Sequence, residues 1–66
     1  MYIELNDNTG EVYYVAPHNI AYLKQGSPTG ALQTVYKVVL SCGKQIILSQ
    51  GEFVNIRTLL NSIGEL

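Results

Sequence analysis

Apolar and polar side chains alternate along the start of the chain with the two-residue period of a β-strand. In residues 2–5, Ile3 and Leu5 share one side of this strand. Residues 11–15 resume the strand pattern after a segment rich in Asn and Asp, whose Gly10 tolerates left-handed backbone. Because two strands joined by such a turn pair with each other, this part of the chain predicts a β-hairpin.

Three more strands are predicted, at residues 20–25, 34–41 and 45–48. The second of these is a strongly β-branched run, which is typical of a strand. Residues 26–31 hold two glycines and a proline and therefore predict a loop. The two residues at 42–43 form a short reversal, so we expect the last two strands to pair in a well-fixed register.

The hydrophobic period changes from that of a strand to that of a helix near the C-terminus. Ser49 and Glu52 have the spacing of a capping box, in which the Ser49 hydroxyl accepts from the Glu52 amide and the Glu52 carboxylate reaches back. Gly64 lies where a left-handed residue would end the helix. The apolar face that we expect on this helix comprises Phe53, Ile56, Leu59, Leu60 and Ile63.

These elements predict an α+β fold that is mainly β. We expect about five short antiparallel strands, arranged as a meander or as a small, partly open barrel, followed by one C-terminal amphipathic helix. The chain has 66 residues, which is enough for a single small domain, residues 1–66, with no separate linker. Cys42 is the only cysteine, which excludes a disulfide within the chain, so a second subunit is the expected way to stabilise so small a core.

Several predicted strands carry large apolar side chains on both faces, most clearly at 12–15, 38–40 and 46–48. A sheet with one face in water should alternate apolar and polar residues, and one helix covers only one face. Between residues 12 and 36 the only formal charge is Lys24, and protein interfaces are depleted in charge and rich in tyrosine. Two interpretations stay open: self-association through an uncharged, Tyr-rich sheet surface, most simply as a C2 dimer, or a sheet that curls and buries both faces within one chain.

Composition argues against several classes of protein. The sequence is 47% hydrophobic and 14% charged with a net charge of −1, which is atypical of disordered segments and of basic nucleic-acid binders. The N-terminus lacks the basic and apolar segments of a signal peptide, and no apolar run reaches the roughly 18 residues of a membrane span. We therefore expect a cytoplasmic protein that does not enter the membrane, in keeping with its single free thiol.

The sequence offers no recognisable catalytic, metal or cofactor motif. His18 is the only histidine and follows a proline in a turn, where we expect it to be exposed. Cys42 is expected to be a half-buried, unreactive thiol. The glycines match neither the P-loop nor the dinucleotide-binding pattern. We therefore expect no enzyme, no metal and no cofactor.

We expect a small interaction protein that binds another macromolecule, most simply a protein, as a regulator or inhibitor. The loop 26–33 would be its adaptable contact segment, or else a connection without function. Two alternatives are an oligomer that holds a small ligand or nucleotide, and a nucleic-acid-binding β module, although the four basic residues are dispersed. The expected interaction residues are Tyr13, Tyr14, Tyr22, Lys24, Ser27, Pro28 and Tyr36.

Several landmarks together are similar to a known family: Met1 to Leu5, Gly10 with Val15, Ile20 to Leu23, Gly43 with Lys44, and Ser49 to Glu52. In these features the chain resembles the small FlbD/SwrD-type proteins associated with bacterial flagellar and swarming motility. The resemblance implies a short, β-rich accessory factor that ends in a brief helix. The loop 26–33 is longer than the turn expected in that family, and the acidic residue after the last strand is displaced to Glu52. The size also resembles that of phage-encoded proteins that bind host or defence machinery.

Overall fold

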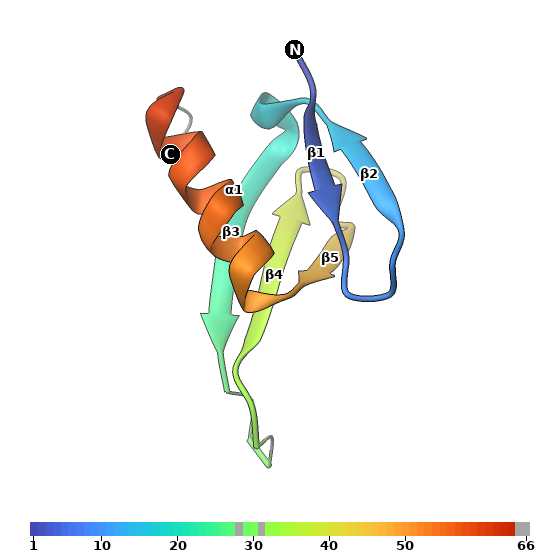
Figure 1. Cartoon of the computed structure of the whole chain (residues 1–66), viewed down its shortest axis with the longest axis vertical. Coiled ribbons are helices and arrows are strands. Elements are labelled where there is room, and N and C mark those ends of the chain that lie inside the picture. The colour runs from blue at the N-terminus through green and yellow to red at the C-terminus, as the bar shows by residue number, and fades with distance from the viewer. Residues whose placement is uncertain (28, 31, 65–66) are drawn as a thin grey trace.

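The computed structural model describes residues 1–27, 29–30 and 32–64, which form two β-sheets, a 3-10 turn and an α-helix (Figure 1). This arrangement confirms the predicted α+β class, with antiparallel strands followed by a C-terminal helix. The elements are β1 (Ile3–Asn6), β2 (Val12–Val15), η1 (Pro17–Asn19), β3 (Ile20–Gly26), β4 (Val35–Leu40), β5 (Gln45–Leu48) and α1 (Gln50–Ser62).

The strands form a two-stranded hairpin and a three-stranded meander. In the hairpin, β1 pairs with β2 from Ile3 opposite Val15 to Asn6 opposite Val12. In the meander, β4 is the central strand between β3 and β5, and a register shift interrupts β3 just after Ile20. The sheets do not close into a barrel, and Tyr14 of the hairpin is 68% exposed. The interpretation in which the sheet curls and buries both of its faces within one chain is therefore wrong.

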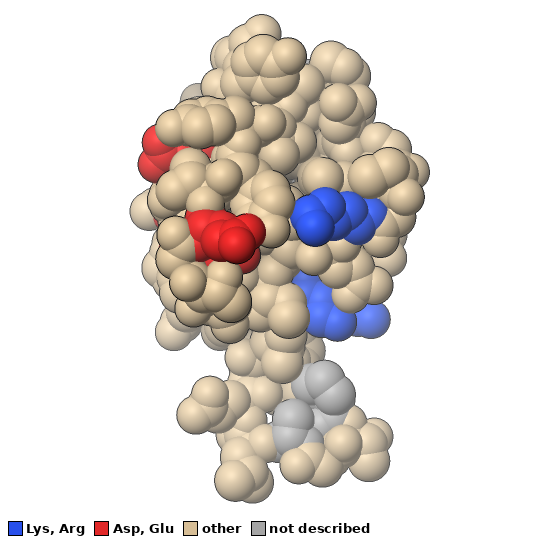
Figure 2. Space-filling view, turned by 90° about the vertical axis from the view of Figure 1, so that its right-hand side faces the viewer, with Lys and Arg blue, Asp and Glu red and all other residues tan. Residues whose placement is uncertain are grey.

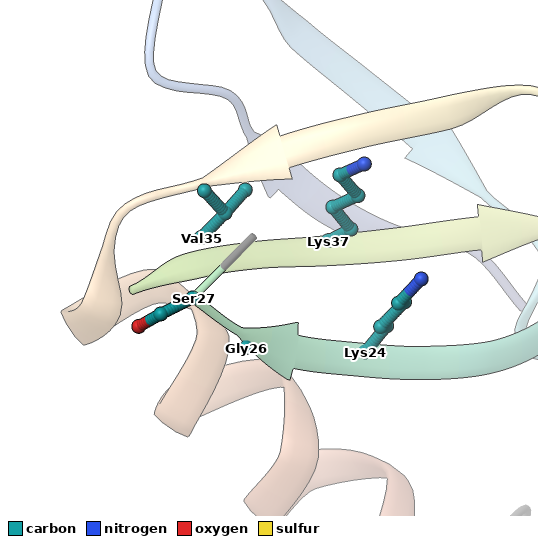
Figure 3. Close-up of a pocket in the computed structure, with 5 residues that line it drawn as sticks. All are labelled: Lys24, Gly26, Ser27, Val35 and Lys37. Carbon is teal, nitrogen blue, oxygen red and sulfur yellow. The ribbon is translucent and has the colours of Figure 1, made fainter. Parts of the chain in front are cut away.

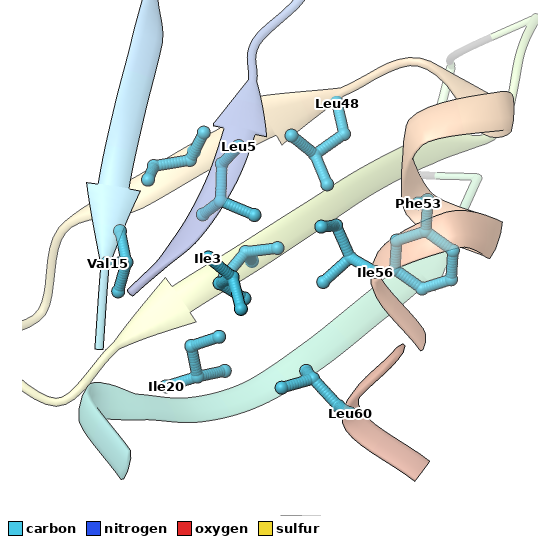
Figure 4. Close-up of a cluster of buried hydrophobic side chains, with 10 residues drawn as sticks. Ile3, Leu5, Val15, Ile20, Leu48, Phe53, Ile56 and Leu60 are labelled. Carbon is cyan, nitrogen blue, oxygen red and sulfur yellow. The ribbon is translucent and has the colours of Figure 1, made fainter. Parts of the chain in front are cut away.

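The hydrophobic core lies between one face of the meander, the hairpin and α1 (Figure 4). Because side chains alternate across a strand, β1, β4 and β5 send every second residue toward this core, whereas in β3 the register shift spaces Ile20 and Leu23 three residues apart. The Tyr36 ring of β4 lies 5.1 Å from the Phe53 ring of α1, centroid to centroid, at a tilted angle. The fully assembled cluster comprises Ile3, Leu5, Val15, Ile20, Val38, Ile46, Leu48, Phe53, Ile56 and Leu60.

The start of α1 confirms one half of the predicted capping box and corrects the other. The Ser49 hydroxyl accepts from the backbone N–H of Glu52 at 3.3 Å, as expected of an N-cap. The Glu52 carboxylate does not close the box, and instead accepts from the backbone N–H of Asn6 at 2.9 Å and from its side-chain amide at 3.2 Å. This carboxylate therefore ties α1 to the end of β1.

The buried face of α1 is narrower than its sequence pattern predicts. Leu60 is completely buried, whereas Leu59 is 39% exposed and Ile63 is also exposed. Since consecutive helical residues are about 100° apart around the axis, Leu59 points away from the stripe that Phe53 and Leu60 share. The helix ends as predicted, with Gly64 at a φ of +78°.

Two turns, the β1–β2 hairpin loop and the β4–β5 turn, have defined local structure. In the hairpin loop, the Asp7 carboxylate accepts from the Thr9 hydroxyl at 2.8 Å and from the backbone N–H groups of Thr9 and Glu11, each at 2.9 Å. These hydrogen bonds, that of the Thr9 hydroxyl foremost, hold the pKa of Asp7 below its ordinary value. In the β4–β5 turn Gly43 has a φ of +95°, and the thiol of Cys42 is exposed, so the expected half-buried thiol is wrong.

Candidate interaction surfaces

The meander has one face that no other described element covers. The hairpin and α1 both lie against the opposite face, from which Val38, Ile46 and Leu48 enter the core (Figures 1 and 4). Residues directly opposite each other in an antiparallel pair share a face, so the register defines the uncovered side. We call it the outer face; it comprises Tyr22, Lys24, Gly26, Val35, Lys37, Val39, Gln45 and Ile47.

A shallow hollow of about 250 Å³ opens on the outer face between β3 and β4 (Figure 3). Gly26 lies directly opposite Val35, and a Cβ atom at Gly26 would meet no atom within 4 Å. The missing side chain therefore leaves room beside Val35. Lys24 and Lys37 project from the neighbouring strands at one end of this hollow, and Ser27 lies at the other.

Two lysines face each other across the outer face. Lys24 of β3 is the direct cross-strand partner of Lys37 of β4. Lys37 is half-buried, and its Nζ donates to the Gln45 Oε1 of β5 at 3.2 Å. Like charges placed directly opposite in a sheet repel each other, so this pair costs stability in the isolated chain.

On the face of the molecule that Figure 2 shows, acidic and basic side chains lie apart. Figure 2 shows the acidic groups on one side of that view and the basic groups on the other. The acidic cluster forms where β1 meets α1, because Glu4 and Glu52 both accept from the side-chain amide of Asn6, at 3.1 and 3.2 Å. None of the eight outer-face positions, all of them within the described chain, is acidic. The outer face is therefore a cationic surface on a protein of net negative charge.

The free edge of β2 is a second candidate surface. The backbone N–H of Asn6 points away from β2, toward Glu52, so Asn6 and its partner Val12 form a pair without mutual hydrogen bonds. These pairs alternate along an antiparallel ladder, and Tyr14 opposite Glu4 is the next of the kind. The backbone N–H and C=O groups of Val12 and Tyr14 therefore point outward from the hairpin.

The tyrosines do not gather on one surface. Tyr22 lies on the outer face, while Tyr2 and Tyr14 line an open groove of about 340 Å³ beside the β4–β5 turn. Tyr13 is half-buried against the core, with the Nζ of Lys44 5.3 Å from the centre of its ring. The surface that the sequence predicts as Tyr-rich is thus divided among several parts of the fold.

The predicted interaction residues divide in the same way. Tyr22, Lys24 and Ser27 meet on or beside the outer face, and Tyr14 lies at the free edge of β2. Tyr13 and Tyr36 pack against the core, and Pro28 lies outside the described residues.

Sequence reasoning missed two residues of the hollow, Val35 and Lys37, whereas Gly26 belongs to the loop 26–33 that it named as a contact segment. The signal that would have identified Lys37 is its register with Lys24 across the long β3–β4 loop. Turn chemistry does not set the register across a loop of that length, whereas it does for the short β4–β5 turn.

Metal-ligand clusters and membrane-spanning helices are both absent from the described residues. Among them, no group of three or more His, Cys, Asp and Glu side chains could hold a metal ion. His18 is exposed in η1, as predicted. No helix in the described ranges is long and apolar enough to span a membrane.

No family model, curated protein or solved structure matches this chain. The resemblance to FlbD/SwrD-type proteins therefore stays a prediction.

Proposed function

We propose that this is a non-enzymatic interaction protein that forms a C2 dimer through the free edges of β2 and binds another macromolecule as a regulator or accessory factor. The observation that supports the dimer is the edge itself: β2, Val12–Val15, is a run of β-favouring residues without a charge. An unpaired strand of this kind is a template for pairing with another chain.

The edge of β2 is self-complementary. A two-fold axis beside Tyr13 places Val12 of one copy opposite the partner's Tyr14, and Tyr14 opposite the partner's Val12. Both residues direct their N–H and C=O groups outward, so each of these two pairs exchanges two hydrogen bonds. The hairpins of the two copies then form one four-stranded sheet.

The other strand edges are less suited to self-pairing. The edge of β1 is occupied by Glu52, and the edge of β5 by the hairpin loop, whose Asn8 N–H donates to the Ile47 carbonyl at 3.0 Å. The β3 strand carries the exposed Lys24 and a register shift, both of which discourage edge pairing. The β2 strand has neither a lysine nor a register shift.

Native mass spectrometry tests the dimer. We expect a species of twice 7.3 kDa for the unmodified protein and a monomer for Val12→Lys, because a lysine at the edge repels its copy across the two-fold axis. The matched control is Ile47→Lys, since Ile47 is exposed to a similar extent but lies on the meander. A monomer of the unmodified protein at micromolar concentration, or a dimer that survives Val12→Lys, contradicts the proposed interface.

The partner-binding role is proposed for the outer face, which stays uncovered when two β2 edges pair. The accessory role agrees with the resemblance to motility factors and with the small size of the chain. A cytoplasmic location is part of the proposal and is supported by the single, exposed thiol of Cys42, which a reducing compartment would keep free.

A further inference from the structure

We propose that the outer face binds an extended acidic segment of a partner protein. A carboxylate of the segment lies between Lys24 and Lys37, and an apolar side chain two residues away enters the hollow beside Val35. The inference rests on the proposed function, because it names the chemistry of the macromolecule that the protein binds.

The lysine pair forms a cationic site on the outer face. Lys24 and Lys37 are direct cross-strand partners, and no other position of the outer face in the described chain carries a compensating acid. Such a pair is unfavourable until an anion bridges it. A carboxylate placed between the two ammonium groups accepts a charge-assisted hydrogen bond from each of them. The Lys37 Nζ already donates to the Gln45 Oε1, so the Lys37 side chain loses less conformational freedom when a ligand binds.

The hollow beside Val35 can take an apolar side chain of the same segment. Lys37 and Val35 are two residues apart on β4, so their side chains leave the same face about 7 Å apart. An extended peptide has the same spacing between its own residues i and i+2. A segment that follows β4 can therefore place an acidic residue at the lysines and an apolar residue in the space that Gly26 leaves open.

The distribution of the other cations favours a peptide over a nucleic acid. Lys44 lies over the Tyr13 ring, which packs against the core, and Arg57 is on α1. The outer face thus holds two of the four basic residues, whereas nucleic-acid affinity comes from many phosphate contacts at once. Val35 and Ile47 beside the lysines suit the aliphatic side chains of a peptide.

Fluorescence anisotropy with a short labelled peptide of repeated Glu-Thr-Val-Thr tests the inference, and the same peptide with Gln in place of Glu is its control. We expect the Glu peptide to bind, and the Gln peptide to bind about tenfold more weakly. Lys24→Gln and Lys37→Gln should each weaken the Glu peptide by a similar factor, while Arg57→Gln, which removes a helical cation, should not. Thermal melting of each variant establishes that it is folded.

Three results would overturn the inference: no binding of the Glu peptide, equal affinity for the Gln peptide, or unchanged affinity in both lysine variants. An oligothymidylate of the same length that binds more tightly than the Glu peptide would assign the face to nucleic acid instead. Native mass spectrometry without peptide separates this inference from the dimer. A monomer that binds the Glu peptide contradicts the dimer alone, and a dimer that does not bind it contradicts the peptide site alone.

Discussion

Ile46 and Ile47 are adjacent residues of the same type in β5, yet the first side chain is 2% exposed and the second is 41% exposed. The difference comes from the two faces of the meander. Ile46 enters the core beneath the hairpin and α1, and Ile47 lies on the outer face beside Lys37. Residue type alone therefore does not show how much a side chain contributes to stability. Of two adjacent isoleucines, only the one that the hairpin and α1 cover is buried.

The two faces also differ in how their central residues are shielded. Val38 is covered by other elements of the fold, whereas Val39, its neighbour on the outer face, is buried although it lies outside the core cluster. Its direct cross-strand neighbours are Tyr22 and Gln45, so side chains of the same sheet shield it. The inner face is thus fully covered, whereas the outer face buries Val39 and leaves Lys24 and Ile47 exposed.

The largest effect is expected where α1 covers the inner face. Leu60→Ala should lower the free energy of unfolding by about 2–5 kcal/mol, because Leu60 is fully buried and its removal leaves a cavity. Leu59→Ala, one residue away on the exposed side, should cost less than about 1 kcal/mol. Urea unfolding followed by circular dichroism measures both. Equal losses would show that α1 does not dock in the orientation described.

A smaller effect is expected at the hydrogen bonds that join α1 to β1. Glu52→Ala removes the acceptor of the Asn6 backbone N–H and should cost about 1–2 kcal/mol. Glu4→Ala is the matched control, since the Glu4 carboxylate accepts from the Asn6 side chain only, and it should cost about 0.5 kcal/mol. The same unfolding experiment checks both variants, and a larger loss at Glu4 would contradict the role given to Glu52.

The two isoleucines of β5 provide the most direct test of the two faces. Ile46→Val should cost about 0.5–1.5 kcal/mol, because one buried methylene is lost from a packed core. Ile47→Val should change the free energy of unfolding by no more than about 0.5 kcal/mol, since much of that side chain is exposed. Thermal unfolding of both variants gives the comparison, and a reversed order would place the wrong face in the core.

The elements of this fold are predictable because local signals define them. The two-residue period of β1, the β-branched run of β4, and the Ser49 cap each identify an element without reference to the rest of the chain. The bounds also agree closely: the strand predicted at 45–48 is β5 itself, and the strand predicted at 34–41 appears as Val35–Leu40.

The candidate site was less predictable, because tertiary contacts decide it. The runs Val38–Leu40 and Ile46–Leu48 are apolar on both faces, so their pattern does not say which side meets the core. The register of β3 against β4 spans a long loop, and that register brings Lys37 opposite Lys24. Conversely, Tyr36 is of a residue type that is common at interfaces and was predicted to lie there, but its ring packs against Phe53.

The smallest expected effect lies on the outer face and has the opposite sign. Lys24→Glu replaces a repulsive cross-strand pair with an attractive one, so it should raise the free energy of unfolding by about 0.2–1 kcal/mol. Because the charges are near the surface, the gain should shrink in about 1 M salt, where the Debye length falls to about 3 Å. Thermal unfolding at low and high salt measures this, and Lys24→Gln should gain less than Lys24→Glu. A loss of stability, or a gain that salt leaves unchanged, would mean that the two lysines do not repel each other in the folded protein. The expected result would instead show that the unmodified sequence keeps a destabilising pair of cations on the outer face, which is the cost expected of a surface that binds an anionic partner.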